Sequence, residues 1–134
     1  LLNAPASEAG SSKRFVDTLW AHENAFQAGD VDRLIEFYAQ DAVSLPPGFA
    51  PSEGREAIEA DLRWLFDEYE LEREFVLVDY EVRGRYATRL GEWEQTLTPK
   101  DPDGETIVER GRCILGWKRI RGTWKVVWEI WNTY

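Results

Sequence analysis

The hydrophobic pattern of this chain changes its period once, after Leu71. Before this point apolar residues recur about every 3.6 residues, which is typical of helices that bury one face. After it they alternate with polar residues about every second position, which is typical of strands. Helices that come first and strands that come afterwards favour an α+β fold, with the helices packed on one face of a curved, mostly antiparallel sheet.

Three segments before the change of period are predicted to be helical. The first covers residues 13–28, with Ser12 as its N-cap and Gly29 ending it. A short second helix begins at Asp30. The third begins at Gly54 and has the clearest helical spacing in the chain, with apolar residues at Ile58, Leu62, Leu65, Phe66 and Tyr69.

A short strand is predicted at residues 41–45, and long strands follow Leu71. The last two cover residues 106–120 and 123–133, with a tight turn at Arg121-Gly122 between them. Large apolar side chains occupy both faces of the final strand: Trp124, Val126, Trp128 and Ile130 on one, and Val127 and Trp131 on the other. A sheet with one face in water alternates more cleanly. The second face, with Trp131 in it, is therefore predicted to form a homodimer interface.

Composition excludes several classes of protein. The 134 residues fit one domain, expected over residues 13–134 after a flexible segment of residues 1–12. A net charge of −9 argues against binding to a nucleic-acid backbone, and no apolar run approaches the length of a membrane span. One His and one Cys, His22 and Cys113, do not predict a metal centre. These features indicate an acidic, soluble domain of the cytoplasm, with export left open.

Three stretches of the sequence resemble a known family. They are the run AFQAGDVDRLIEFYAQDAVSLPPG, the following GREAIEADLRWLF, and the ending GRCILGWKRIRGTWKVVWEIWN. Together they resemble the SnoaL-like branch of the nuclear transport factor 2-like superfamily, which has a cystatin-like fold. The resemblance implies a cone in which three helices cover the concave face of a curved sheet and leave a pocket. It also implies frequent dimerisation through the sheet, in a superfamily that holds both cofactor-independent enzymes and non-catalytic binding domains.

Carboxylates in such a pocket are the candidate catalytic groups, because burial raises a carboxyl pKa toward neutrality. The two candidate bases are Asp41 and Glu129. Tyr38 and Arg112 are the candidates for stabilising developing negative charge. Simpler interpretations remain open: Asp41 could be a turn or cap residue, and Glu129 could form an ion pair with Arg112 or Lys118.

The candidate ligand-binding residues combine flat aromatic side chains with one charge: Trp20, Glu23, Phe49, Trp64 and Trp128. Aromatic walls suit a flat hydrophobic ligand, although most of these tryptophans could equally belong to the core. Glu23 is the one charge on the apolar stripe of the first helix, or lies at the edge of that stripe. His22 is predicted near the surface, and Cys113 is predicted to be an inert core residue.

The sequence therefore predicts a pocket protein for a small, largely hydrophobic molecule. One hypothesis is an enzyme without a cofactor that works by general acid/base chemistry, as an isomerase, cyclase, dehydratase or hydrolase. The other is a non-catalytic ligand-binding or dimerisation module. The two differ in whether a carboxylate lies in a water-poor pocket within about 3 Å of the reacting atom.

Overall fold

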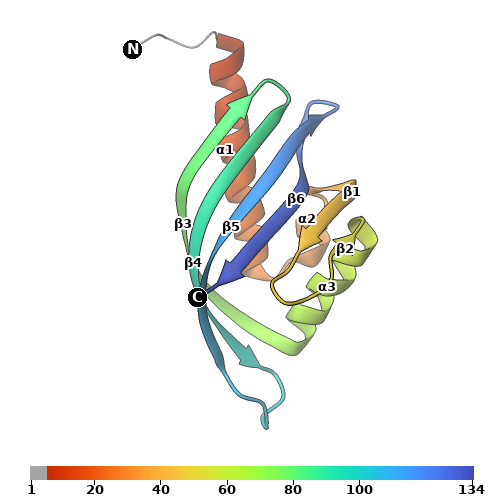
Figure 1. Ribbon diagram of the computed structural model, residues 1–134, viewed down its shortest axis with the longest axis vertical. Coiled ribbons are helices and arrows are strands. Elements are labelled where there is room, and N and C mark those ends of the chain that lie inside the picture. Colours follow the sequence, from red (N-terminus) through yellow and green to blue (C-terminus); the bar gives the residue numbers. More distant parts are fainter. Residues whose placement is uncertain (1–5) are drawn as a thin grey trace.

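The computed structural model describes residues 6–134, in which three helices, all preceding the four long strands in the chain, pack against one face of a six-stranded sheet (Figure 1). The helices are α1 (Ala6–Ala28), α2 (Val31–Ile35) and α3 (Arg55–Glu68). The strands are β1 (Tyr38–Leu45), β2 (Ser52–Glu53), β3 (Tyr69–Arg83), β4 (Tyr86–Pro99), β5 (Ile107–Ile120) and β6 (Thr123–Thr133). The predicted α+β fold class and the order of its elements are confirmed.

The strands lie side by side in the order β2-β1-β6-β5-β4-β3. The four long strands form an antiparallel meander that curves around α1 (Figure 1). Strand β1 instead runs parallel to β6 and places Ser44 directly opposite Glu129. This pairing joins two parts of the chain that are far apart in sequence, and it creates the site described below.

Helix α1 begins earlier than the sequence predicted. It begins at Ala6, so Ser12 lies within the helix and is not its N-cap. No proline interrupts residues 6–12, so nothing there stops the helix from extending toward the N-terminus. The remainder of the predicted flexible segment, residues 1–5, lies outside the described residues.

The predicted local signals around α2 are confirmed. Gly29 follows α1 with a positive φ of 66°, a conformation that glycine adopts without steric cost. Asp30 caps α2, because its side chain accepts a hydrogen bond from the backbone N–H of Arg33 at 3.2 Å. The tight turn between β5 and β6 is likewise at Arg121 and Gly122, both with positive φ.

A β-bulge in β6 changes which residues face the helices. Gly116 of β5 pairs with Trp128, but the next residue, Trp117, pairs with Val126. Val127 is therefore an extra residue in β6, and the alternation of side chains shifts by one position across it. Trp124 and Val126, before the bulge, are buried against the helices, whereas Trp128 and Ile130, after it, lie on the outer face of the sheet.

The bulge also places Trp131 on the inner face. Trp131 lies directly opposite the buried Cys113 of β5 and packs against the core. The prediction that Trp131 belongs to an interface on the outer face is therefore wrong. It counted the alternation through β6 without the extra residue, and a shift of one residue exchanges the two faces of a strand.

The hydrophobic core lies between α1 and the inner face of the sheet. Phe15 of α1 is fully buried, with its ring 5.5 Å from that of Trp117 and 5.3 Å from that of Trp124. Cys113 is a buried free cysteine, as predicted. None of the helices found in residues 6–134 combines the length and the apolar character needed to cross a membrane.

Candidate active site

Glu129 is the centre of a hydrogen-bonded group on the inner face of the sheet. Its Oε1 accepts a hydrogen bond from Ser44 Oγ, and its Oε2 accepts one from the Tyr38 hydroxyl, each at 2.9 Å. Burial raises the pKa of Glu129 above its ordinary value, although the hydrogen bonds from Ser44 and Tyr38 act in the opposite direction. A carboxyl group of this kind is suited to accept and return a proton.

Tyr38 connects Glu129 to the first helix. Its side chain is buried, and its hydroxyl lies 3.3 Å from Nε2 of His22. Burial and the nearby Glu129 carboxylate raise the pKa of Tyr38 well above its ordinary value. The phenol therefore stays protonated and acts as a hydrogen-bond donor to Glu129.

His22 is buried, with 4% of its surface exposed, so the prediction of a surface histidine is wrong. Its ring packs against those of Phe37, Tyr38 and Trp117 at centroid distances of 5.3–5.7 Å. Burial, followed by the positive charges of Arg89 and Arg73, lowers the pKa of His22 well below its ordinary value. His22 is therefore neutral around pH 7.

Arg89 sets the direction of this hydrogen-bonded chain. Its NH2 atom lies 3.4 Å from Nδ1 of His22, and its side chain is 2% exposed. An arginine can only donate, so Nδ1 of His22 is the acceptor and the ring hydrogen is on Nε2. His22 then donates to the Tyr38 oxygen, and Tyr38 donates to Glu129. The side chains from Arg89 to Glu129 thus form one directed chain that ends on the carboxylate.

Glu23 belongs to a buried ion pair beside this series of hydrogen bonds. Both of its oxygens accept hydrogen bonds from Arg73, from Nε and NH2 at 3.0 Å each. Gln27 donates to Oε2 at 2.9 Å, and NH2 of Arg89 is 4.0 Å from Oε1. Glu23 is only 1% exposed, so the reading of Glu23 as a residue at the edge of the helical stripe is wrong. Its carboxylate holds arginines rather than acting as a free base.

The structure brings Tyr38 and Glu129 together but leaves Asp41 and Arg112 outside their group. Asp41 is exposed on β1. Arg112 lies on the outer face, where its Nε is 3.7 Å from an oxygen of Glu92 and both side chains are about half exposed. Because Arg112 and Glu129 are on opposite faces of the sheet, the predicted ion pair between them does not form, and Arg112 cannot stabilise charge at Glu129.

The predicted aromatic ligand residues lie mostly away from Glu129. Phe49 is 81% exposed in the loop after β1, and Trp64 is 59% exposed on α3. Trp128 is on the outer face of the sheet. Trp20 contacts the ring of Phe75 at 5.7 Å, next to the buried arginines. Of the five predicted ligand-binding residues, Glu23 is thus part of the buried polar network and Trp20 adjoins it.

Four residues of this group were not predicted from the sequence: Ser44, His22, Arg73 and Arg89. The sequence nevertheless contains signals for two of them. His22 follows Phe15 and Leu19 at helical spacing, which places all three on the buried face of α1. Arg89 alternates with Ala87 and Gly91, which are also buried on β4. An arginine at such a position needs partners from other elements, and this marks it as a candidate functional residue.

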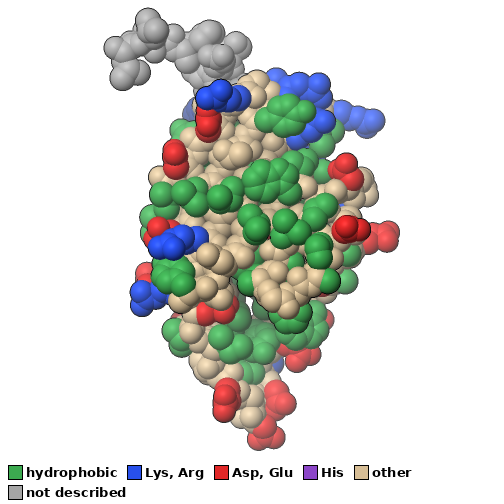
Figure 2. Space-filling model, in the orientation of Figure 1, with side chains coloured by type: hydrophobic (Ala, Val, Ile, Leu, Met, Phe, Trp, Pro, Cys, Tyr) green, Lys and Arg blue, Asp and Glu red, His purple; other side chains and the backbone are tan. Residues whose placement is uncertain are grey.

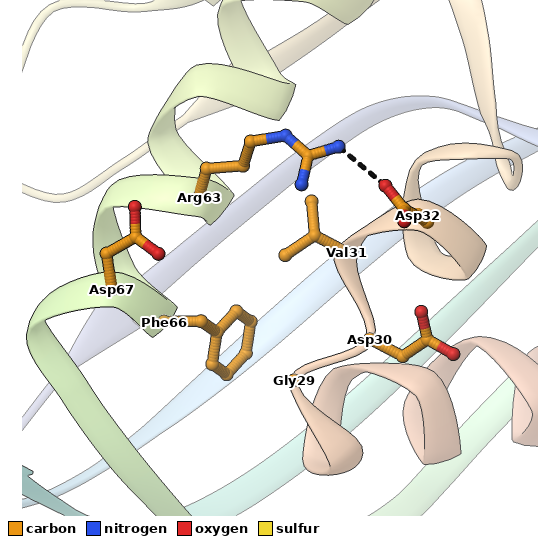
Figure 3. Close-up of a pocket in the computed structure, with 7 residues that line it drawn as sticks. All are labelled: Gly29, Asp30, Val31, Asp32, Arg63, Phe66 and Asp67. Carbon is orange, nitrogen blue, oxygen red and sulfur yellow. Dashed lines mark hydrogen bonds and ion pairs between the residues drawn. The ribbon is translucent and has the colours of Figure 1, made fainter.

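A separate depression lies at the junction of α2 and α3, away from Glu129 (Figure 3). It is open and polar, and Arg63 from α3 closes an ion pair with Asp32 across it at 2.7 Å. Phe66 packs against Gly29 at its base. The charged groups around this depression are exposed to water, whereas burial raises the pKa of the Glu129 carboxyl. Within residues 6–134 no cluster of three metal-ligating side chains occurs.

A curved sheet covered on one face by three helices is the architecture of the cystatin-like, nuclear transport factor 2-like class of α+β proteins. The sequence matches the family model of the SnoaL-like domain over residues 18–125, and the chain belongs to this family. The predicted family resemblance is therefore confirmed. No curated protein matches the sequence.

Solved structures agree on the fold. A ketosteroid isomerase-like protein from Erwinia carotovora atroseptica has a TM-score of 0.82 at 16% identity, with 90% of this chain and 94% of that chain covered. An NTF2-like protein with a cystatin-like fold from Novosphingobium aromaticivorans has a TM-score of 0.74 at 18% identity, covering 93% and 82% of the two chains. LinA has a TM-score of 0.79 at 16% identity, covering 95% and 88%. At these identities the likeness shows the fold alone.

Proposed function

We propose that the protein binds a small, largely hydrophobic molecule between the helices and the inner face of the sheet, and catalyses proton transfer on it without a cofactor. The observation that carries this proposal is the Glu129 carboxyl, which has a raised pKa and two hydroxyl donors fixing its position. Isomerase and dehydratase chemistry both begin with such a proton transfer. The description of one structural relative as ketosteroid isomerase-like agrees with this class.

In the proposed reaction, ionised Glu129 takes a proton from a carbon next to a carbonyl group of the substrate. The electron pair of the broken C–H bond moves into the carbonyl, which becomes an enolate. Glu129 then returns its proton to a different carbon in an isomerisation, or to a leaving hydroxyl group in a dehydration. Tyr38 and Ser44 hold the carboxylate in one orientation throughout, which reduces the entropy lost on reaching the transition state.

A non-catalytic binding module is the alternative, in which Glu129 only accepts a hydrogen bond from a ligand. Proton exchange separates the two. The protein would be incubated in D₂O with a panel of apolar cyclic ketones, and deuterium entering next to the carbonyl would be followed by NMR. Accelerated exchange on at least one ketone supports catalysis. Saturable ketone binding without accelerated exchange supports the binding module instead.

We also propose that the protein forms a homodimer through the outer face of the sheet. Apolar side chains gather in the middle of this face (Figure 2). They are 39–61% exposed and comprise Val76, Val78, Ile114, Trp128 and Ile130. The adjoining charges are paired across strands, Glu92 with Arg112 and Glu94 with Arg110, each at 3.7 Å. These two ion pairs reduce the repulsion that two copies with a net charge of −9 each would meet there.

The substitution Trp128→Glu is expected to convert the dimer to a monomer, because it would bury a charge in the centre of the proposed interface. Light scattering after size exclusion would give the mass of each species. Trp64→Glu is the matched control, since Trp64 is 59% exposed on α3 and should leave the dimer intact. A monomeric unmodified protein, or a folded Trp128→Glu protein that stays dimeric, would contradict this interface.

A further inference from the structure

Arg89 carries a buried positive charge whose one carboxylate partner among residues 6–134, Glu23, lies at 4.0 Å and is shared with Arg73. Its side chain is 2% exposed, and its Nε and NH1 atoms have no hydrogen-bond partner in that part of the chain. The remaining nitrogen, NH2, has only His22 Nδ1 at 3.4 Å and Glu23 Oε1 at 4.0 Å. Buried polar groups in native proteins nearly always have partners, so two nitrogens without partners on one guanidinium call for an explanation.

The nearby acidic groups do not supply the missing partner. Glu23 is committed to Arg73, which contacts both of its oxygens at 3.0 Å. Cys113 is also close to Arg89, but burial raises the pKa of its thiol, so it stays neutral, and it donates toward the Gly91 carbonyl at 3.8 Å. Two guanidinium groups therefore share one carboxylate at this point of the interior.

The surroundings of Arg89 fix its plane, while its Nε and NH1 atoms stay buried without a hydrogen-bond partner among the described residues. The guanidinium lies over the ring of Phe75, at 4.6 Å from the ring centre. Phe75 in turn lies against Gly91, where a Cβ atom would be 2.3 Å from the ring. Glycine at position 91 thus makes room for the ring that holds Arg89. A guanidinium held by its face presents its N–H groups in its own plane, which matches the planar oxygen pair of a carboxylate.

We infer that Arg89 binds a carboxylate group of the ligand on the inner face of the sheet. This inference rests on the proposed function in one respect, namely that the interior admits a small molecule. Tyr38 and His22 separate Arg89 from Glu129, so the anionic group would bind at a distance from the carbon that Glu129 deprotonates. The substrate class is then a small hydrophobic carboxylic acid whose acid group is remote from the reacting carbon.

The test compares phenylacetate with its neutral analogue phenylacetamide by isothermal titration calorimetry on the unmodified protein. A charge-assisted contact with Arg89 is expected to make phenylacetate bind at least about tenfold more tightly. His22 provides a second readout, because it is the one histidine of the chain and accepts a hydrogen bond from Arg89. Its Nδ1 resonance in ¹⁵N NMR is expected to shift on saturation with phenylacetate and to stay unchanged with phenylacetamide.

Two substitutions locate the effect. Arg89→Met is expected to abolish the preference for the acid, whereas Arg112→Met, on the outer face, is expected to retain it. Equal binding of acid and amide, or a preference that survives in Arg89→Met, would overturn the inference. The comparison in the unmodified protein needs no variant, so poor folding of Arg89→Met does not remove the test. Glu129→Gln should bind phenylacetate normally while losing proton exchange, which separates this inference from the proposed catalysis.

Discussion

Replacing Glu129 by glutamine is expected to slow deuterium exchange into a reactive ketone by about 10²–10⁴-fold, the usual contribution of a general base. The amide keeps the size of the side chain, and its one oxygen can still accept a hydrogen bond from either Tyr38 or Ser44, while its NH2 group faces the other hydroxyl oxygen. It cannot accept the substrate proton at neutral pH. The initial exchange rate at saturating ketone, followed by NMR, measures this loss directly.

The matched control is Glu92→Gln. Glu92 is a glutamate of the same sheet, but it lies on the outer face beside Arg112 and is about half exposed. Its substitution should leave the exchange rate within about twofold of the unmodified protein, since surface substitutions rarely change more than the local solvation. Exchange at the original rate in Glu129→Gln would mean that another group removes the proton, and the assignment of Glu129 as the base would fail.

Glu23→Gln is expected to lower the free energy of unfolding by about 3–5 kcal/mol, because removing one partner of a buried ion pair leaves the other charge uncompensated. Here the effect falls on two arginines. Arg73 would lose the carboxylate that both its Nε and NH2 atoms contact, and Arg89 would lose the negative charge nearest to it. Equilibrium unfolding in urea, followed by tryptophan fluorescence, gives the change in free energy.

Glu94→Gln provides the comparison for this prediction. Glu94 pairs with Arg110 at 3.7 Å on the outer face, where both side chains are more than half exposed. Exposed pairs contribute about 0–1 kcal/mol, so this variant should unfold nearly as the unmodified protein does. A Glu23→Gln protein that is as stable as Glu94→Gln would show that the interior around Arg73 and Arg89 is accessible to water.

The features that the sequence predicted correctly depend on neighbouring residues. The end of α1 at Gly29 and the cap at Asp30 depend on residues within a few positions, as does the turn at Arg121-Gly122. The change of period after Leu71 placed the boundary between the last helix and the long strands only a few residues late, since α3 ends at Glu68 and Tyr69, predicted on the helical stripe, begins β3. Caps, turns and periodicity are local signals, so one sequence is enough to detect them.

The features that it missed depend on contacts between distant segments. The extra residue Val127 in β6 is visible only through its pairing with β5, and it reversed the assignment of Trp128 and Trp131. The parallel pairing of β1 with β6 has no local signal either, because it places Ser44 next to a residue 85 positions away. Register and strand order are properties of the assembled sheet.

The candidate site shows the same division. Tyr38 and Glu129 were chosen for their chemistry, and the structure brings them into contact. Arg112 was chosen for its charge, but the face of the sheet on which it lies could not be derived from alternation alone. The interior arginines are Arg73 on β3 and Arg89 on β4. The type of residue was therefore predictable, whereas its position on the inner face required the register.

The acid/base role of Glu129 is tested most directly by measuring its own titration. Side-chain carboxyl resonances would be followed by ¹³C NMR against pH, and the Glu129 signal identified by its absence in Glu129→Gln. Because burial favours the protonated form, the apparent pKa is expected above the ordinary value of 4.5, and the stability contributed by this group should fall as the pH rises through it. A Glu129 signal that titrates at or below 4.5 would contradict the account, since the carboxyl would then be an ordinary ionised side chain.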